Sequence, residues 1–324
     1  MIKLVNVSKY YNSNDVVALG LRKVNLELRL NEFVAVVGES GSGKTTLLNV
    51  ISGIDTYEDG EMYINGEETS YYSINDLENY RKKYVAFVFQ DYNLIDSYTV
   101  LQNVEAPLLL SGYPKDKIKN RALEIIDRVG LSTHVHHKAS KLSGGQKQRV
   151  VIARALAKDC PIIAADEPTG NLDSESAKQI IKLLAEIAKD KLVIMVTHDF
   201  SQVESFATRK IRIYDGEIVE DQTMVKVDEG EFPELDDKEY KASFSSLLKI
   251  SLQNLLSVPK KTILMVIVFW FFAFFVGLSY AGYINVTNTS VELTNFYFSY
   301  TNPDRLVVKK ADDSPLSDDD LAEL

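Results

Sequence analysis

Cysteine is almost absent from this sequence, and positive charge is not in excess. Cys160 is the only cysteine among 324 residues, so no disulfide bond can form within the chain. It lies between apolar runs, which favours a small buried thiol over a nucleophile. Acidic residues total 46 against 36 lysines and arginines, giving a net charge of −10. That balance lacks the basic footprint of a nucleic-acid-binding protein, so we expect no nucleic-acid partner.

The N-terminus also lacks the apolar core of a signal peptide. It reads MIKLVNVSKYY, so we expect the first part of the chain to remain in the cytoplasm. The acidic excess is confined to two stretches. Residues 226–241 hold seven acids and three lysines, and residues 312–324 hold six acids and no base. The excess acidic residues are therefore concentrated in a linker and a C-terminal tail, and they do not mark a binding site.

One uncharged run is long enough to cross a membrane. Residues 262–283 read TILMVIVFWFFAFFVGLSYAGY, 22 residues in a row without a charge. A helix of that length spans a bilayer core of about 30 Å, and its hydrophobicity on all sides argues against a buried core helix. Lys260 and Lys261 precede the run, and the next basic residue is Arg305. The positive-inside rule then places the N-terminal domain in the cytoplasm and residues after about 284 outside.

Residues 1–222 alternate short apolar runs with helical stretches, a pattern typical of an α/β domain with buried, mostly parallel strands. The runs are Leu4–Val7, Phe33–Val37, Val85–Phe89, Ile162–Ala165 and Leu192–Val196. Residues 223–242 are interpreted as an acidic linker. Residues 243–259 place leucines at helical spacing opposite a polar face, which favours an interfacial amphipathic helix over an ordinary core helix.

A glycine-rich stretch with a lysine carries the first chemical signal. Residues 38–45 read GESGSGKT, which fits the P-loop pattern, and they lie between a strand-like and a helix-like run. Such a loop turns backbone N–H groups toward phosphate oxygens at a helix N-terminus. Lys44 is expected to reach the β- and γ-phosphates of a nucleotide, and the Thr45 hydroxyl to bind Mg²⁺.

Two carboxylates end the apolar run at residues 162–165. Asp166 is placed to hold Mg²⁺ through its water shell, and Glu167 to accept a proton from the attacking water. Alone, such a pair is most often a solvated strand end. Together with the P-loop it indicates a nucleotide-hydrolysing site.

Further motifs resemble those of one family, the ABC ATPases. LSGGQ at residues 142–146 resembles the family's signature motif, with Ser143, Gly144, Gly145 and Gln146 as candidate residues. The helix that begins near Gln146 cannot share the P-loop's own phosphate, so it must serve the ATP of another subunit. The resemblance implies a switch role for His198, a Q-loop role for Gln90 toward Mg²⁺ and water, and a D-loop role for Asp173 across a dimer interface.

The resemblance covers residues 1 to about 222 and implies a P-loop NTPase fold with a helical signature subdomain and with ATP and Mg²⁺ as cofactors. The catalytic candidates are Glu167, His198 and Gln90, and the metal candidates are Thr45, Gln90 and Asp166. The expected ATP-binding residues are Tyr11, Gly38, Glu39, Ser40, Gly41, Ser42, Gly43, Lys44, Thr45 and Thr46.

Two assignments stay open. Tyr11 is the first candidate for stacking on adenine, with Tyr10 a close rival and a core tyrosine the alternative. His134, His136 and His137 form a cluster without a Cys or carboxylate partner, so surface histidines are favoured over a metal site.

Finer features, such as ADEPTGNLD at residues 165–173, resemble the macrolide-export and lipoprotein-release group, the MacB-like ABC systems. In that group a permease domain begins with an amphipathic helix and a first span and continues with an extracytoplasmic domain and further spans. This chain stops 41 residues after the span, at what looks like the start of a helix near Ser317. Residues 284–324 are therefore expected to begin an extracytoplasmic domain that is truncated here.

The resemblance implies a homodimer of ATPase domains that closes over ATP at the cytoplasmic membrane. What the ATPase drives stays open between two classes. One is export or extraction of a lipophilic molecule, a peptide or a lipoprotein. The other is mechanical signalling across the membrane to an extracytoplasmic partner, without transport. A non-membrane ABC ATPase is disfavoured, since it would have a coiled coil or a second nucleotide domain in place of the span.

Overall fold

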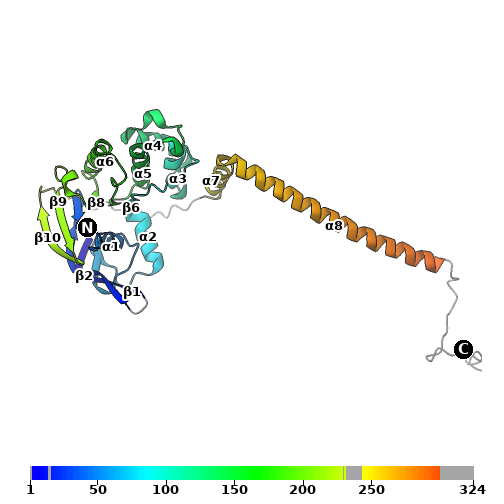
Figure 1. The fold of residues 1–324 in the computed structure, drawn as a ribbon, viewed down its shortest axis with the longest axis horizontal. Coiled ribbons are helices and arrows are strands. Elements are labelled where there is room, and N and C mark those ends of the chain that lie inside the picture. Colours follow the sequence, from blue (N-terminus) through cyan, green and yellow to red (C-terminus); the bar gives the residue numbers. More distant parts are fainter. Residues whose placement is uncertain (1, 14–15, 229, 231–242, 300–324) are drawn as a thin grey trace, which may run out of the picture. The chain divides into compact units, whose positions relative to one another are not determined.

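The computed structural model describes residues 2–13, 16–228, 230 and 243–299 (Figure 1). The chain divides into two compact units, Met1–Ser257 and Val258–Leu324. Most of the expected acidic linker and the expected helix start near Ser317 lie outside the described residues.

The larger sheet of the first unit is mostly parallel, which confirms the α/β prediction. Its strand order is β10-β9-β3-β8-β7-β6, and only the β9–β10 pair is antiparallel. The inner strands are buried on both faces because helices cover them, so they read as continuous apolar runs. The strands are β3 (Phe33–Val37), β6 (Val85–Val88), β7 (Ile162–Asp166), β8 (Leu192–Thr197), β9 (Arg209–Tyr214) and β10 (Glu217–Thr223).

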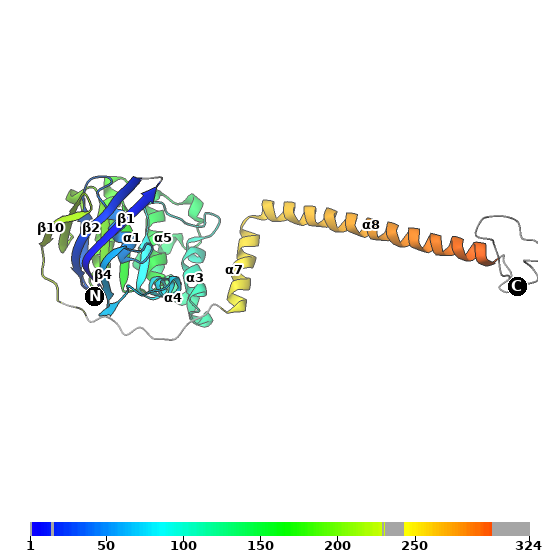
Figure 2. The ribbon, with the colours of Figure 1, turned by 90° about the horizontal axis from the view of Figure 1, so that it is seen from below.

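A second, antiparallel sheet was not anticipated. Its order is β2-β1-β4-β5, formed by β1 (Ile2–Ser13), β2 (Val16–Leu28), β4 (Asp59–Ile64) and β5 (Glu67–Glu68) (Figure 2). The β1 strand is longer than the expected Leu4–Val7 run, because shifts in register break the alternation of apolar and polar residues. One such break lies at Asn6, whose φ is +51°.

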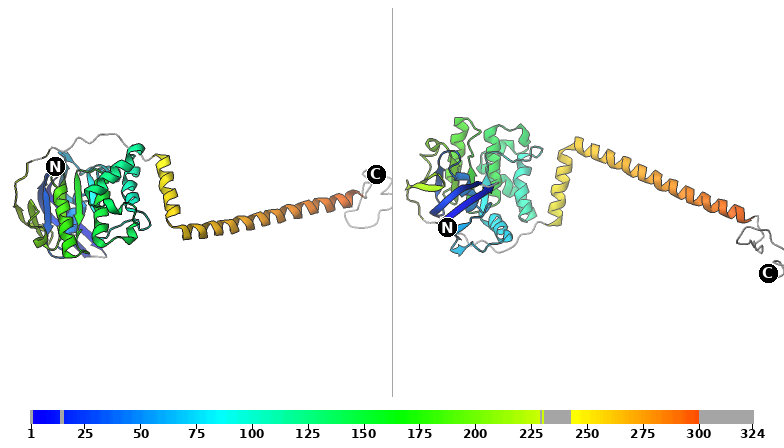
Figure 3. Two further views of the ribbon diagram at one scale, coloured as in Figure 1. Left: turned by 90° about the horizontal axis from the view of Figure 1, so that it is seen from above. Right: turned by 60° about the horizontal axis from the view of Figure 1, so that its bottom comes forward.

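Helices fill the space between the sheets and cover the parallel sheet. The core between the sheets combines strand residues with α1 (Lys44–Ile51), through Leu47 and Leu48. Three helices, α3 (Val100–Leu110), α4 (Lys115–Arg128) and α5 (Gly144–Ala157), pack together into a helical subdomain on the other core (Figure 3). The same unit also contains α2 (Ile74–Tyr84), α6 (Ser174–Ile187), η1 (Ser132–His134), η2 (Ala139–Lys141) and η3 (Phe200–Gln202).

Helix α7 (Phe244–Ser257) belongs to the first compact unit, because it packs on α3. Ile250 contacts the core of the helical subdomain, and the Tyr98 hydroxyl donates a hydrogen bond to Asn254 Oδ1 at 2.5 Å. Lys249 lies 3.7 Å from Glu105. The polar face of α7 therefore faces the protein, and its leucines, including Leu248, Leu252 and Leu256, are exposed.

The second unit contains one long helix, α8 (Pro259–Ser299, 41 residues). Its segment Pro259–Asn288 is long and apolar enough to cross a membrane, with a mean hydropathy of 2.5 and no buried residue in its most apolar window. The helix runs 16 residues beyond the expected end at Tyr283, because no glycine or proline interrupts residues 284–299.

Candidate functional site

The P-loop connects β3 to α1 and wraps around the lysine ammonium. Gly41 and Gly43 adopt φ values of +78° and +103°, which L side chains rarely adopt. Lys44 is only 6% exposed, and its Nζ donates a hydrogen bond to the Glu39 carbonyl at 2.6 Å. The Glu39 carbonyl thus holds the ammonium within the loop that precedes α1. Helix N-termini favour anions, so this cradle fits a phosphate group.

An unpartnered hydroxyl supports the same interpretation. The Oγ atom of Ser42 is buried without a hydrogen-bond partner among the described residues. A Cβ on Gly38 would come within 2.6 Å of that oxygen and 2.4 Å of the Ile213 carbonyl. The loop therefore leaves a polar atom to be satisfied and requires glycine at its first position.

The carboxylate of Asp166, the last residue of strand β7, lies beside the P-loop. The Thr45 hydroxyl, in the first turn of α1, donates to Asp166 Oδ1 at 3.4 Å. Burial raises the pKa of Asp166, the charge of Glu167 adds to the rise, and Thr45 and Lys44 oppose it. A hydroxyl and a carboxylate at this separation supply the oxygen ligands that Mg²⁺ prefers, so the residues fit a magnesium ion.

Glu167 and His198 lie together at the ends of adjacent strands. β7 and β8 pair in parallel, with Asp166 opposite Val196, so both residues emerge at the same edge of the sheet. His198 Nδ1 is 3.5 Å from Glu167 Oε1, and the two side chains are 66% and 30% exposed. Glu167 has φ +42°, and its N–H donates to the Val196 carbonyl at 3.1 Å. A partly exposed carboxylate is thereby held next to an imidazole.

Gln90 approaches this edge from the loop after β6. A Cβ added to Gly170 would lie 2.7 Å from Gln90 Nε2, so the carboxamide packs against the turn that follows Glu167. Among the described contacts, none joins Gln90 directly to Thr45 or Asp166. The structure therefore places Gln90 against the turn after Glu167, without a described bond to the predicted metal residues.

Tyr11 lies beside the start of α1. A Cβ on Gly20 would meet the Tyr11 ring at 2.8 Å and the Thr46 methyl at 3.0 Å, so these side chains are neighbours. The Tyr11 hydroxyl donates to Asp55 at 3.0 Å, and its side chain is partly exposed. Burial raises the pKa of the Tyr11 phenol. The geometry favours Tyr11 over Tyr10 as the aromatic residue next to the P-loop.

The signature residues lie elsewhere in the same unit. Helix α5 begins at Gly144, two residues before the expected start near Gln146, because Ser143 and Gln146 form a capping box. A Cβ on Gly144 would meet the Tyr92 hydroxyl at 2.9 Å, and one on Gly145 would meet Ser176 Oγ at 3.0 Å. The described contacts of the signature run to Tyr92, the D-loop, α6 and His134 of η1, and none reaches the P-loop.

Asp173 serves as the N-cap of α6. Its Oδ1 accepts the Ser176 N–H at 2.9 Å, and this bond is the main cause that lowers the pKa of Asp173.

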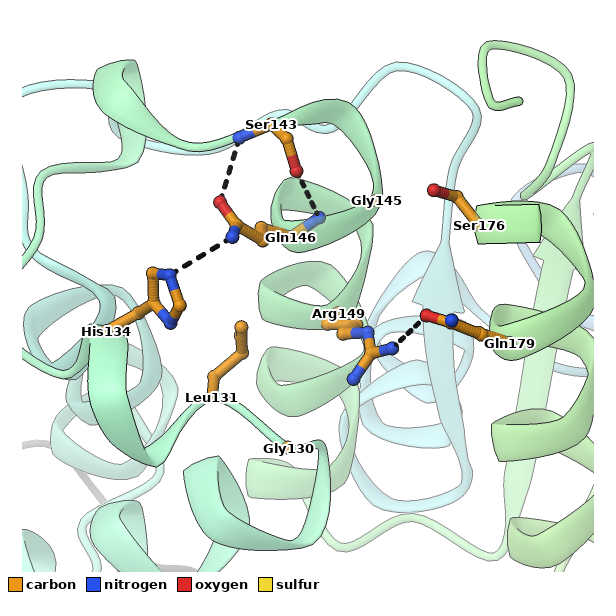
Figure 4. A pocket seen from close by; sticks show the side chains of 9 residues that line it. All are labelled: Gly130, Leu131, His134, Ser143, Gly145, Gln146, Arg149, Ser176 and Gln179. Atoms are coloured by element: carbon orange, nitrogen blue, oxygen red, sulfur yellow. Dashed lines mark hydrogen bonds between the residues drawn. The ribbon is translucent and has the colours of Figure 1, made fainter. Parts of the chain in front are cut away.

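A cavity of about 290 Å³ opens between helix α6 and the signature (Figure 4). It is lined by Gly130, Leu131, His134, Ser143, Gly145, Gln146, Arg149, Ser176 and Gln179.

The three clustered histidines differ in their exposure. His136 and His137 are exposed, but His134 is half-buried and its Nε2 lies 3.1 Å from Gln146 Nε2. The 3₁₀ turn η1 directs the half-buried ring of His134 toward α5, and the other two histidines lie on the surface. The described residues contain no group of three His, Cys, Asp or Glu side chains that could hold a metal ion.

Cys160 is buried, as predicted, and burial raises the pKa of its thiol to about 11.

Sequence reasoning missed the polar bonds between α7 and the helical subdomain. The pairs Tyr98–Asn254 and Glu105–Lys249 join residues more than 140 positions apart. The polar face of α7 was visible in the sequence, but no local signal showed which surface it would contact.

Comparisons with known proteins agree with this geometry. Residues 21–170 match the family model described as ABC transporter. An uncharacterized ABC transporter ATP-binding protein of Methanocaldococcus jannaschii is 42% identical over 221 residues, covering 68% of this chain and 98% of that protein. The macrolide export ATP-binding/permease protein MacB of Bartonella henselae is 40% identical over 222 residues, or 68% of this chain. The chain matches only 34% of that longer relative.

A solved structure has the same fold. It is a dimeric structure of a post-hydrolysis state of the ATP-binding cassette MJ0796 bound to ADP and Pi, with a TM-score of 0.63 and 39% identity, covering 70% of this chain and 100% of that one. The shared fold and the identity across whole relatives place the first unit among ATP-hydrolysing cassettes. The chain belongs to the ABC transporter family and carries the family's ATP-binding domain.

Proposed function

We propose that this chain works as a head-to-tail homodimer that binds two ATP molecules between its ATP-binding domains. The observation that carries the proposal is the separation of two half-sites on one chain. The P-loop half holds Lys44, Thr45 and Asp166, and the signature half holds Ser143 without contact to it. Two-fold symmetry completes both sites by pairing each P-loop with the other copy's signature. The relative MJ0796 was solved as a dimer, which supports this arrangement.

At the P-loop half, residues 38–46 bind the phosphates through backbone N–H groups, and Lys44 gives up the Glu39 carbonyl for phosphate oxygens. Thr45 and Asp166 would hold Mg²⁺, with Gln90 beside the turn after Glu167, and a bound ion would supply positive charge that offsets the charge of the phosphates. Tyr11 stacks on the adenine from beside Thr46.

Glu167 accepts the proton of the attacking water, and His198 contacts the γ-phosphate. Glu167 suits this role because its carboxylate is partly exposed and its left-handed backbone is held by the Val196 carbonyl. The 3.5 Å contact with His198 keeps the base beside a group that can donate to phosphate.

At the signature half, Ser143, Gly144, Gly145 and Gln146 bind the γ-phosphate of the other copy's ATP at the N-terminus of α5. Asp173, which caps α6 beside the signature, contacts the other copy across the interface. Closure of the pair therefore depends on ATP, and hydrolysis releases it.

We further propose that ATP-driven closure drives a MacB-like membrane process, the export or extraction of a lipophilic molecule, peptide or lipoprotein at the cytoplasmic membrane. The MacB relatives and the apolar segment Pro259–Asn288 support this proposal. The ATPase domain then lies in the cytoplasm, residues after about 284 lie outside and contact an extracytoplasmic partner, and the exposed leucines of α7 rest in the membrane surface.

A complementation experiment tests the composite site. Lys44→Ala disables the P-loop half and Ser143→Arg disables the signature half, so each full-length variant alone is expected to be inactive. An equal mixture forms mixed dimers that each retain one intact composite site, so it should recover about a quarter of the wild-type ATPase rate. The matched control mixes Lys44→Ala with Asp166→Ala, which lie in the same half-site and cannot complement. Recovery no greater than in this control would refute the shared site.

A further inference from the structure

His134 is held in place by the end of α4. It is the last residue of η1, and its N–H donates to the Leu131 carbonyl at 2.8 Å. Leu131 is buried, and the Ser132 hydroxyl donates to Asp127 of α4 at 2.5 Å. Arg149 also ties α5 to this turn by donating to the Val129 carbonyl at 3.2 Å. The imidazole therefore projects from a fixed backbone toward the first turn of α5 (Figure 4).

Hydrogen bonds determine the orientation of the Gln146 carboxamide. The Ser143 N–H donates to Gln146 Oε1 at 3.0 Å, which directs the amide oxygen at the N-cap. The amide nitrogen then points to His134 Nε2, 3.1 Å away. A rotated carboxamide would set its NH₂ against the Ser143 N–H, two donors face to face, so the capping box excludes that orientation.

The orientation of the amide in turn determines the tautomer of His134. An NH₂ group can only donate, so His134 Nε2 must accept and carry no proton. The proton of the neutral ring then lies on Nδ1, which donates to Thr133 Oγ1 at 2.9 Å. The chain of bonds runs from Thr133 through the imidazole and the carboxamide to the backbone of Ser143.

We propose that His134 is a positioning residue of the signature motif. Its unprotonated Nε2 holds the Gln146 carboxamide in the orientation that caps Ser143, and so presents the Ser143 hydroxyl to the other copy's ATP. This inference rests on the proposed function, because only a composite site gives the Ser143 hydroxyl a phosphate to bind. An imidazolium cannot accept the amide N–H, so protonation of His134 breaks either this bond or the capping bond.

The charged and titratable groups around His134 come from several elements. Arg149 of α5 lines the same cavity and donates to Gln179 of α6. Asp127 of α4 is engaged by Ser132, and the ring of His137 lies edge-on 5.0 Å from that of His134. Gln179 also donates to Glu175 at 3.2 Å, which occupies that carboxylate. Of these side chains, Arg149 and Gln179 line the cavity with His134, and the Gln146 bond determines which ring nitrogen accepts.

The test compares three variants of the full-length protein in a Glu167→Gln background, so that dimers accumulate without turnover. His134→Ala removes the acceptor, and His134→Gln supplies an acceptor oxygen that does not titrate. His136→Ala is the matched control, since this neighbouring histidine is exposed. Light scattering after gel filtration measures the ATP concentration that gives half-maximal dimer, at about pH 8 and about pH 6, the range in which histidine changes charge. A fluorescent ATP analogue measures binding to the P-loop of the monomer.

At about pH 8, His134→Ala should raise the half-maximal ATP concentration about fivefold, the effect of one lost hydrogen bond, with unchanged binding of the analogue. His134→Gln and His136→Ala should stay within about twofold of the parent. At about pH 6, the parent should weaken more than His134→Gln, because an imidazole can gain a proton in this range and a glutamine amide cannot.

Each contrary result has a distinct meaning. If His134→Ala forms dimers like the parent, or if His134→Gln shows the parent's full loss at low pH, the positioning role is overturned. If His134→Ala also loses binding of the analogue, the residue is structural and the proposal fails as well. If the parent itself shows no ATP-dependent dimer, the proposed composite site is refuted, and the role of His134 is refuted with it.

Discussion

Replacing Glu167 with glutamine isolates its proposed role as the base. The substitution keeps the side-chain shape and the backbone bond to Val196, so the left-handed conformation at φ +42° is no more strained than before. The carboxylate has one described ion-pair partner, His198 at 3.5 Å, and is partly exposed. The free energy of unfolding should therefore change by less than about 0.5 kcal/mol.

The catalytic effect should be far larger than the effect on stability. A positioned general base contributes about 10²- to 10⁴-fold to a rate, or about 2.7–5.4 kcal/mol of activation free energy. ATP binding should persist, since Lys44 and the P-loop backbone are untouched. Loss of the Glu167 charge also removes one of the causes that raise the pKa of Asp166, so that pKa should fall.

Steady-state phosphate release from the full-length protein measures the rate, and gel filtration with ATP measures the dimer. We expect a loss of at least about a hundredfold in kcat together with a dimer that persists in ATP. Glu175→Gln, in the first turn of α6, serves as the matched control for removal of a nearby acidic charge. Turnover within about threefold of wild type would refute the base assignment, and slow turnover with lost ATP binding would point to damage of the P-loop.

Three further predictions concern stability and packing. Gly43→Ala should cost at least about 2 kcal/mol in thermal unfolding, because its Cβ would lie 2.5 Å from the Gly20 carbonyl at φ +103°. The control Gly66→Ala, at φ +86° with no atom within 4 Å, should cost only about 1 kcal/mol. Asp166→Asn should stabilise the nucleotide-free protein by up to about 1 kcal/mol while abolishing hydrolysis, since folding raises the pKa of this carboxyl and so penalises its charge. That penalty is present above the folded-state pKa of Asp166 and disappears as the pH falls. The gain in melting temperature of Asp166→Asn should therefore shrink in acid. A gain that does not depend on pH would contradict this reasoning. Tyr98→Phe should speed hydrogen exchange of the α7 amides about fivefold, as expected for a lost bond of about 1 kcal/mol, whereas Tyr71→Phe, 90% exposed, should not.

The chemistry at each strand end could be predicted from sequence because it depends on local order. A P-loop needs glycines, a lysine and a helix start in succession, and residues 38–46 supply all of them. Parallel strands that end at one edge of a sheet bring Glu167 and His198 together without any further signal. The buried strands were equally readable, because strands covered on both faces must be apolar throughout.

The antiparallel sheet could not be predicted in the same way. Its β1 strand contains breaks in register, so the period-2 pattern that marks a half-exposed strand is lost. The start of α5 was placed two residues late for a related reason, since the capping box at Ser143 depends on a side-chain bond from Gln146. Local irregularities of this kind leave only weak traces in composition.

The sequence by itself determined that this protein binds and hydrolyses ATP and that one of its segments is apolar enough to cross a membrane, because both properties follow from residues adjacent in the chain. Only the tertiary structure decided which face of α7 meets the protein and that His134 meets Gln146. Those contacts join polar groups on different elements, and a polar side chain carries no signal of its partner until packing brings the two within hydrogen-bond distance.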